Sequence, residues 1–561
     1  MNRKLISYLA IALLPGVAAC KDELVVTNPN SGDTQRVLGT PNDAESLLGT
    51  YYKRWSSGVY GSTIDLQGMA NNMSLMNYAS LANSCQNART PFTGAANVNA
   101  PGNTCKNEQF RLYSILGEVN RVASSFLTTQ KNGLTLGSPA RDARGAAFAE
   151  FLRGISIGYV TLMHDSVAVV SVGQDAQDAG KLVSYKVGMD SALAALQRAV
   201  DLTNSAATGG DGFPLPATWI PSPTSWTKAE FTKLIRSYAA RLRANVARTP
   251  AERAAVNWVT VIADARAGIT ADHLITTSTT LGPGNAWRST YDTYGLWHQM
   301  PPFMIGMADV SGSYAAWIAQ PLSERGANRS SFFMVTPDLR FPQGATRAAQ
   351  QADFPITSCQ GASQVCKRYF ANRIGNDVFD GSAFGTSNYD FVRFHSWAVS
   401  GDGTARNGNT PFFVKAENDL LLAEGLYRTG DLAGAAAIVN VTRVRNGLPA
   451  ITDFNATSPV PGGAANCVPK VPVAPFNVVG CGNLFEALKY EKRIETAYTH
   501  YVPWYLDGRG WGDLPKDTPL YWPVPYQDLQ ARGSAIADIY GTGPGAGNAP
   551  GSTAALSVYG W

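Results

Sequence analysis

The sequence of 561 residues has little of what marks a protein that binds by charge. It has no run of five or more basic residues, and its net charge of +4 at pH 7 is spread along the chain. Nucleic acids and anionic membrane surfaces attract basic clusters, so neither is indicated as a partner. Charged residues make up only 16% of the chain and hydrophobic residues 45%. This balance predicts a globular protein with a large core.

Metal-binding and catalytic motifs are also missing. The five histidines are scattered and no C-x-x-C occurs, so we expect no metal site and no cofactor. The sequence has no G-x-S-x-G, H-E-x-x-H, P-loop or dinucleotide-binding motif. An exported glycoside hydrolase is the alternative, because such enzymes act with two carboxylates on either side of a bond. Asp and Glu are sparse, and no pair of them has a recognisable context, so we expect no enzyme.

The N-terminus has only a short apolar run. About ten apolar residues, roughly Leu5 to Leu14, follow a basic start, whereas a membrane-spanning helix needs about 20. We interpret residues 1–19 as a cleaved export signal. The small residues before Cys20 resemble a bacterial lipobox, in which the cysteine thiol is diacylated and the cysteine becomes the new N-terminus. Two acyl chains anchor a protein stably, so residues 20–40 are expected to be a lipid-anchored tether; an ordinary signal peptide is the alternative.

Six of the seven cysteines fall into close pairs, with spacings of 20, 7 and 14 residues. The pairs are Cys85 with Cys105, Cys359 with Cys366, and Cys467 with Cys481. Disulfides persist in the oxidising compartment that an exported chain enters. We therefore predict three local disulfides that staple Asn-, Gly- and Pro-rich loops, with buried free thiols as the alternative. The odd cysteine, Cys20, is then the lipid attachment site.

Amphipathic helices are expected in three parts of the chain. They cover 141–165 with 184–204, then 227–269 with a turn at 248–251, and finally 415–427 with 432–445. Ser184 is expected to cap its helix, and Pro250 suits the start of the helix after the turn. The last pair, joined by Thr429-Gly430-Asp431, resembles a tetratricopeptide unit. Such units stack because one unit cannot bury its own apolar face.

Between these helices lie two stretches without helical periodicity. Residues 276–409 are rich in Gly, Ser, Asn, Pro and aromatic residues, and 449–483 are similar. Loops this long are usually functional or disordered, and the aromatic residues and cysteines favour order. We therefore divide the mature chain into an N-terminal helical part over 41–275, an irregular aromatic-rich region over 276–409 and a C-terminal part over 410–561. The expected fold class is all-α dominated.

Several motifs resemble those of the RagB/SusD family of outer-membrane nutrient-binding lipoproteins, and together they cover nearly the whole chain. They are "FRLYSILGEVN" over 110–120, "DLRFP" over 338–342, "LLLAEGLYRTGDLAGAAAIVNVTRVRNGL" over 420–448, "LKYEKRIETAY" over 488–498, "GRGWGDL" over 508–514 and "LYWPVP" over 520–525. The chain departs from the family pattern at "THYV", 499–502, which replaces the usual E-G-x-R. Phe110 stands where tryptophan is usual, and a glycine separates Arg509 from Trp511.

The resemblance implies a SusD-like scaffold of tetratricopeptide-like helix pairs that carries an irregular ligand face. It also implies a lid on a SusC-like TonB-dependent outer-membrane channel, which captures and delivers an oligosaccharide, or less often a peptide, without catalysis. Lys21-Asp22-Glu23 resembles the signal that sends such lipoproteins to the cell surface. A helical-repeat lipoprotein that scaffolds periplasmic assembly is the alternative function.

A glycan-binding surface needs flat aromatic faces for the sugar ring, with amides and carboxylates for its hydroxyl groups. Two groups of residues have this composition, and we predict that they bind the ligand. The first is Trp287, Tyr291, Tyr294 and Trp297, and the second is Trp55, Tyr60, Asp65, Asn71 and Asn72. For each of these residues, packing in the core is the alternative. Trp504, Trp511 and Trp522 are expected to pack in the scaffold.

Overall fold

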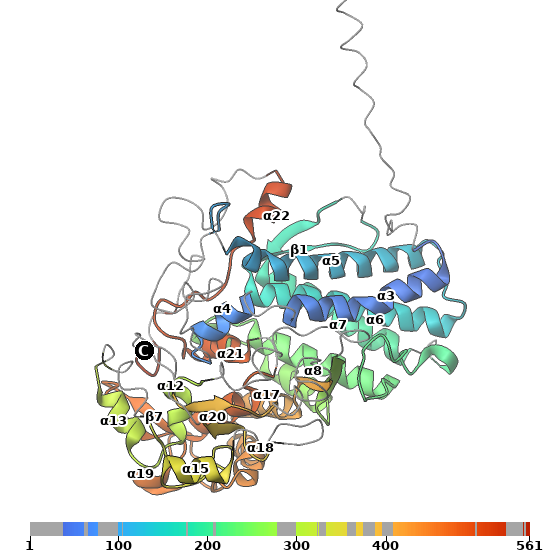
Figure 1. Ribbon diagram of the computed structural model, residues 1–561. Coiled ribbons are helices and arrows are strands. Elements are labelled where there is room, and N and C mark those ends of the chain that lie inside the picture. The colour runs from blue at the N-terminus through green and yellow to red at the C-terminus, as the bar shows by residue number, and fades with distance from the viewer. Residues whose placement is uncertain are drawn as a thin grey trace, which may run out of the picture.

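The structure, a computed structural model, consists mainly of helices (Figure 1). It describes residues 38–60, 66–76, 99–103, 105–174, 178–205, 209–277, 299–321, 324, 332–355, 366–373, 387–394, 408–499, 502–533, 554 and 557–561. The all-α dominated fold predicted from the sequence is confirmed.

The N-terminal part is a layer of long helices that lie side by side (Figure 1). They are α3 (Pro41–Tyr60), α4 (Leu66–Met73), α5 (Lys106–Lys131), α6 (Pro139–Met163), α7 (Tyr185–Asn204), α8 (Lys228–Asn245), α9 (Pro250–Ala254) and α10 (Trp258–Arg266). Local chemistry fixes several of their starts, since Thr227 and Thr249 each accept a backbone N–H with their side chains. Pro250 opens α9 as predicted. Ser184 precedes α7, but its side chain makes no capping hydrogen bond, so that part of the prediction is wrong.

Helix α6 is the centre of this layer. It contacts α5, α7 and α8, and every residue from Ala147 to Met163 is buried. The expected amphipathic helix is therefore wrong here, because neighbours cover α6 on all sides. Gly154 allows the closest approach, since a Cβ at that position would lie 2.5 Å from Leu196 Cδ2 on α7. Among the described residues, α6 is the one helix long and apolar enough to cross a membrane, and it lies inside the protein.

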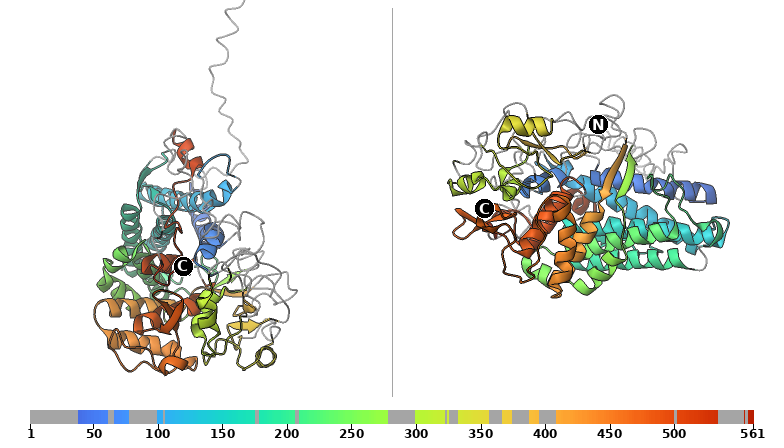
Figure 2. Two further views of the ribbon diagram at one scale, coloured as in Figure 1. Left: turned by 90° about the vertical axis from the view of Figure 1, so that its left-hand side faces the viewer. Right: turned by 90° about the horizontal axis from the view of Figure 1, so that it is seen from below.

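The C-terminal part continues the stack of helix pairs. Its helices are α17 (Lys415–Arg428), α18 (Leu432–Arg445), α20 (Leu484–Thr496), α21 (Pro503–Trp511) and α22 (Tyr526–Ala531). The predicted turn between α17 and α18 is confirmed: Gly430 has φ 92°, and the Asp431 side chain accepts the Gly434 N–H at the start of α18. Helix α17 also packs against α10 and α20, as the view from below in Figure 2 shows. The two helical parts thus form one continuous stack.

The irregular region starts and ends at one place on this stack. Strand β3 (His273–Thr277) pairs antiparallel with β6 (Gly408–Phe413), so Thr277 lies opposite Gly408. The described residues between them form only short elements: α12 (Pro302–Ile305), the 3-10 turn η4 (Gly306–Ala308), α13 (Ser313–Ala319), α15 (Arg347–Asp353), β4 (Phe370–Asn372) and β5 (Tyr389–Phe391). Strands β4 and β5 pair with each other. The expected lack of long helices is confirmed for these residues.

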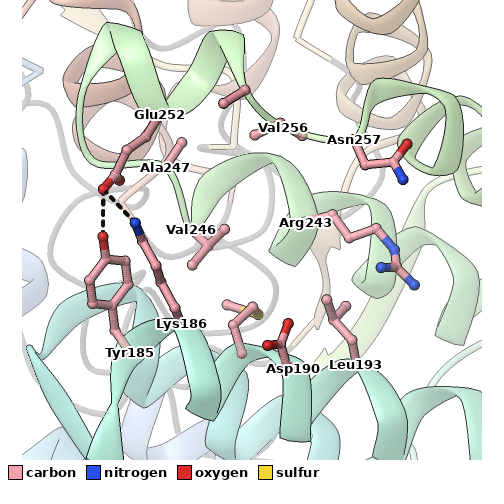
Figure 3. A pocket seen from close by; sticks show the side chains of 12 residues that line it. Tyr185, Lys186, Asp190, Leu193, Arg243, Val246, Ala247, Glu252, Val256 and Asn257 are labelled. Atoms are coloured by element: carbon pink, nitrogen blue, oxygen red, sulfur yellow. Dashed lines mark hydrogen bonds and ion pairs between the residues drawn. The ribbon is translucent and has the colours of Figure 1, made fainter.

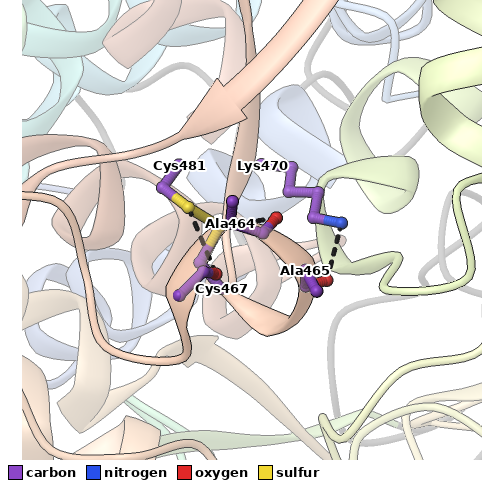
Figure 4. The surroundings of a disulfide bond; sticks show 6 residues. Ala464, Ala465, Cys467, Lys470 and Cys481 are labelled. Atoms are coloured by element: carbon purple, nitrogen blue, oxygen red, sulfur yellow. Dashed lines mark hydrogen bonds between the residues drawn. A yellow bond between two sulfur atoms is a disulfide. The ribbon is translucent and has the colours of Figure 1, made fainter.

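The second stretch expected to be irregular contains a β-hairpin instead. After the short helix α19 (Gly463–Asn466), strands β7 (Lys470–Val473) and β8 (Val478–Cys481) pair antiparallel. Cys467 and Cys481 form the predicted disulfide across this hairpin (Figure 4). Cys105 and Cys366 are also disulfide-bonded; their predicted partners, Cys85 and Cys359, lie outside the described residues. The remaining elements are β1 (Ser166–Val169), which pairs with β2 (Lys181–Ser184), and the turn η3 (Gly210–Gly212).

The family-like motifs form a buried ion network that joins the irregular region to the stack. Arg340, from "DLRFP", is fully buried and donates to Asp338, Glu491 and Glu495. Its Nη1 lies 2.9 Å from Glu491 Oε2 on α20 and 3.2 Å from Glu495 Oε1. Tyr490 donates a further hydrogen bond to Asp338 at 2.6 Å. Charges this deep are tolerated because they are paired and hydrogen-bonded.

A second network holds α9, α17 and α21 together. Arg253 donates from Nε to Glu424 Oε1 at 2.9 Å and from Nη2 to Asp507 Oδ1 at 3.1 Å, and Trp511 Nε1 donates to Glu424 at 3.0 Å. Burial raises the pKa of Glu424, but the charge and hydrogen bonds of Arg253 outweigh it and hold that pKa well below its usual range. The buried charges of these two networks therefore hold elements of the scaffold together. Trp504, Trp511 and Trp522 are buried, as predicted.

Candidate functional site

Helix α3 and strands β3 and β6 meet at one corner of the scaffold. Tyr52 on α3 lies 3.0 Å from His273 on β3, measured from hydroxyl oxygen to Nε2. The Tyr60 ring at the end of α3 lies 4.3 Å from the Phe412 ring on β6. Since β3 ends at Thr277, the segment with the predicted aromatic platform leaves the scaffold from this α3–β3–β6 corner.

The chain that follows this segment is held by hydrogen bonds to β5 and to Ser387. Met300 donates its backbone N–H to the Tyr389 carbonyl at 2.9 Å, and Ser387 donates its own to the Met300 carbonyl at 2.9 Å. The Tyr389 hydroxyl lies 2.9 Å from Gln350 Oε1, and burial raises its pKa to about 12. Backbone hydrogen bonds therefore hold the chain on both sides of residues 278–298. Trp287, Tyr291, Tyr294 and Trp297 themselves lie outside the described residues, as does Asp65.

The second group contains buried amides without partners. Asn71 and Asn72 lie on α4 and are 0% and 4% exposed. Among the described residues, neither amide atom of Asn71 nor Nδ2 of Asn72 has a hydrogen-bond partner. An unsatisfied buried polar group costs about 1–3 kcal/mol, and native proteins leave few of them. This pair therefore offers buried polar groups that a polar ligand or water could satisfy.

Trp55 belongs to the core rather than to a ligand surface. It has no exposed surface, and aromatic neighbours enclose its indole: the ring of Tyr159 lies at 5.2 Å and those of Tyr52 and Tyr238 at 5.4 and 6.0 Å. No face of the ring is open for stacking on a sugar. Trp55 therefore packs in the core, and the prediction that it contacts a ligand is wrong.

The polar groups of the corner are uncharged at neutral pH. Burial, with the nearby Arg241 as a second cause, lowers the pKa of His273 to about 3, and burial raises the pKa of Tyr52 far above its ordinary value. Arg241 itself is paired with Glu417 through two hydrogen bonds of 2.7 Å. Neutral hydroxyl and amide groups suit a ligand that is itself rich in hydroxyl groups better than a charged one.

The molecule also has a cavity that could not be predicted from the sequence. It lies between α7 and the turn that joins α8 to α10, and Asp190 and Arg243 are among its lining residues. These two residues are far apart in the chain and belong to no motif, so only the packing of the helices brings them together.

No family model matches the chain, and no curated protein matches it in sequence. Solved structures do. A SusD superfamily protein from Bacteroides thetaiotaomicron is 15% identical with a TM-score of 0.50, over 88% of this chain and 96% of that one. A SusD homolog from the same organism is 13% identical with a TM-score of 0.49, over 89% of each chain. A laminarin binding SusD-like protein is 11% identical with a TM-score of 0.45, over 88% of this chain and 98% of that one.

Proposed function

Since the chain has the fold of the SusD-like proteins, we propose that it binds an oligosaccharide without catalysing a reaction and passes it to a SusC-like TonB-dependent channel of the outer membrane. The observation that carries this proposal is the pair of buried amides at Asn71 and Asn72, which find no partner in the described part of the protein.

The chemistry of the corner region matches a neutral glycan. Sugar hydroxyl groups donate to amide oxygens and accept from amide N–H groups, and Asn71 and Asn72 offer both. The apolar face of a pyranose ring packs on aromatic side chains, which the 287–297 segment carries between its two fixed ends. A peptide ligand would also use amides, and it is the alternative that the binding experiment decides.

The location proposed for the protein is the outer leaflet of the outer membrane, where Cys20 would carry the lipid anchor. The tether over 20–40 leads directly to Pro41, the first residue of α3. The anchor is tested by Cys20→Ala, which should move the protein from membrane to soluble fractions; unchanged fractionation would contradict it. Protease protection in intact cells would contradict exposure at the cell surface.

The binding experiment is a glycan and peptide array on the soluble form that lacks residues 1–20, followed by titration of the best ligand. Asn71→Leu replaces both amide atoms by methyl groups and keeps the branching of the side chain. Because these atoms have no partner among the described residues, the melting temperature should stay the same or rise. Binding should weaken by about ten-fold or more, the cost of one lost hydrogen bond in a buried site.

The matched control is Asn418→Leu, a buried asparagine whose amide is fully used. Asn418 Nδ2 donates to the Ala265 carbonyl at 2.8 Å, and its Oδ1 lies 2.9 Å from Ser237 Oγ. This variant should lose stability but keep its affinity. Trp287→Ala and Trp297→Ala should weaken binding without changing the melting temperature. The site is refuted if the Asn71→Leu variant binds like the wild type, and the glycan is refuted if only peptides bind.

A further inference from the structure

A cavity of about 390 Å³ lies between α7 and the turn from α8 to α10 (Figure 3). We refer to it as the α7–α10 cavity. Its volume falls in the range of roughly 300–1,000 Å³ that small-molecule sites occupy. None of its described lining residues belongs to α3, β3 or β6, so it is distinct from the α3–β3–β6 corner.

Apolar side chains form part of the cavity wall. Met189 and Leu193 come from α7, Val246 from the end of α8, and Val256 from the turn before α10. Met189 is only 2% exposed, and the other three are half-buried. An aliphatic group of a ligand would remove this surface from water, which contributes about 25 cal/mol for each Å² buried.

At one end of the cavity the polar groups satisfy each other. Tyr185 donates its hydroxyl to Glu252 Oε1 at 2.6 Å, and Lys186 Nζ lies 3.4 Å from the same oxygen (Figure 3). The other oxygen, Oε2, accepts the Arg248 backbone N–H at 2.8 Å. Burial raises the pKa of Glu252, but these hydrogen bonds together outweigh it and lower that pKa. At this end the charges of Lys186 and Glu252 therefore compensate each other.

Toward the other end, two opposite charges keep polar atoms that have no partner among the described residues. Asp190, on α7, makes no hydrogen bond or ion pair with any described residue. Within the described part of the chain, Arg243 on α8 donates only from its Nε, to Asp264 at 2.8 Å. Asp264 also accepts from Arg236 at 3.0 Å, so two guanidinium groups share one carboxylate. Figure 3 shows Asp190 and Arg243 on the two helices that border the cavity, and no ion pair joins them.

We propose that the α7–α10 cavity binds a small zwitterion with an aliphatic side chain, that is, a free amino acid or a short peptide. The ammonium group would pair with Asp190, the carboxylate would accept from the terminal nitrogens of Arg243, and the aliphatic side chain would lie on Met189, Leu193 and Val246. Charge-assisted hydrogen bonds of this kind are roughly twice as strong as neutral ones. The proposal is independent of the glycan site.

The test is calorimetric titration of the full chain in detergent with L-leucine and with leucyl-leucine. We expect saturable binding of at least one of them, and none of N-acetyl-leucine amide, which has the same side chain without either charge. Asp190→Asn should weaken binding by about ten-fold or more without loss of stability, because the carboxylate is exposed and has no partner among the described residues.

The matched control is Asp201→Asn, on the exposed face of the same helix but outside the cavity. It should bind like the wild type. The proposal is overturned if neither zwitterion binds, if N-acetyl-leucine amide binds equally well, or if the Asp190→Asn and Asp201→Asn variants have the same affinity. Glycan binding should be unchanged in both variants, so this test can fail while the proposed function stands.

Discussion

Replacing Arg340 by methionine tests whether the charged motifs hold the scaffold together. In the wild type, the guanidinium of Arg340 lies among the carboxylates of Asp338, Glu491 and Glu495, all with 0% exposed side chains. Glu495 would keep Arg445 at 2.9 Å. In the Arg340→Met variant, the one described ion pair left to Glu491 would be that with Arg443, at 3.8 Å. Asp338 would retain hydrogen bonds from neutral groups of the described residues, such as the Tyr490 hydroxyl.

The expected cost follows from these leftover charges. Leaving one buried charge uncompensated costs about 3–5 kcal/mol, and the Arg340→Met variant leaves two carboxylates poorly compensated. We therefore expect the free energy of unfolding to fall by about 3–5 kcal/mol or more. The control is Arg54→Met, which breaks an ion pair with Glu118 whose side chains are 44% and 41% exposed. That pair contributes about 0–1 kcal/mol.

The assay is chemical denaturation of both variants and the wild type at pH 7 and pH 5.5. Burial already raises the pKa of Glu491, although Arg340 opposes the shift, so removing Arg340 raises that pKa further. Glu491 then takes up a proton as the pH falls, and the deficit of the Arg340→Met variant should shrink at pH 5.5. The reasoning is refuted if Arg340→Met costs no more than Arg54→Met, or if its deficit is the same at both pH values.

Two further predictions concern the disulfide and the buried histidines. Replacing Cys467 and Cys481 by serine should lower the free energy of unfolding by roughly 2–3 kcal/mol, because the bond closes a loop with a sequence separation of 14; a reductant should then destabilise the wild type more than this variant. Burial lowers the pKa of His164 to about 4 and that of His273 to about 3, so the unfolded chain takes up protons first as the pH falls below about 6.5. The free energy of unfolding should therefore decrease between pH 6.5 and 5 by up to about 1.4 kcal/mol per pH unit for each histidine, and an unchanged slope in the His273→Asn variant would contradict this.

Local chemistry explains which elements could be predicted from the sequence. The turn between α17 and α18 follows from Gly430, which adopts a positive φ, and from Asp431, which caps the next helix. The hairpin β7–β8 was missed because prolines within a run argue against a strand. Pro472 is tolerated because the sheet has only two strands, so each strand has a free edge where no backbone N–H is needed.

Long-range packing explains what could not be predicted. The burial of α6 on all sides depends on α5, α7 and α8, which other parts of the chain supply. Whether an aromatic residue such as Trp55 packs in the core or faces a ligand depends on its neighbours in space. The α7–α10 cavity joins Asp190 with Arg243, and no spacing rule relates these two positions.

The pairing of β3 with β6 has a consequence for how proteins of this architecture diversify. Because Thr277 and Gly408 are neighbours across the ladder, the intervening segment leaves the helical stack and returns to it at one place. A longer or shorter segment would change the loop-closure entropy only slowly. Exchange of this segment between homologues should therefore exchange the predicted aromatic ligand contacts in one step, provided that the incoming segment keeps an equivalent of Asp338 and Arg340 to neutralise Glu491. Ligand contacts on this segment and the stability of the helical stack could then change independently in evolution.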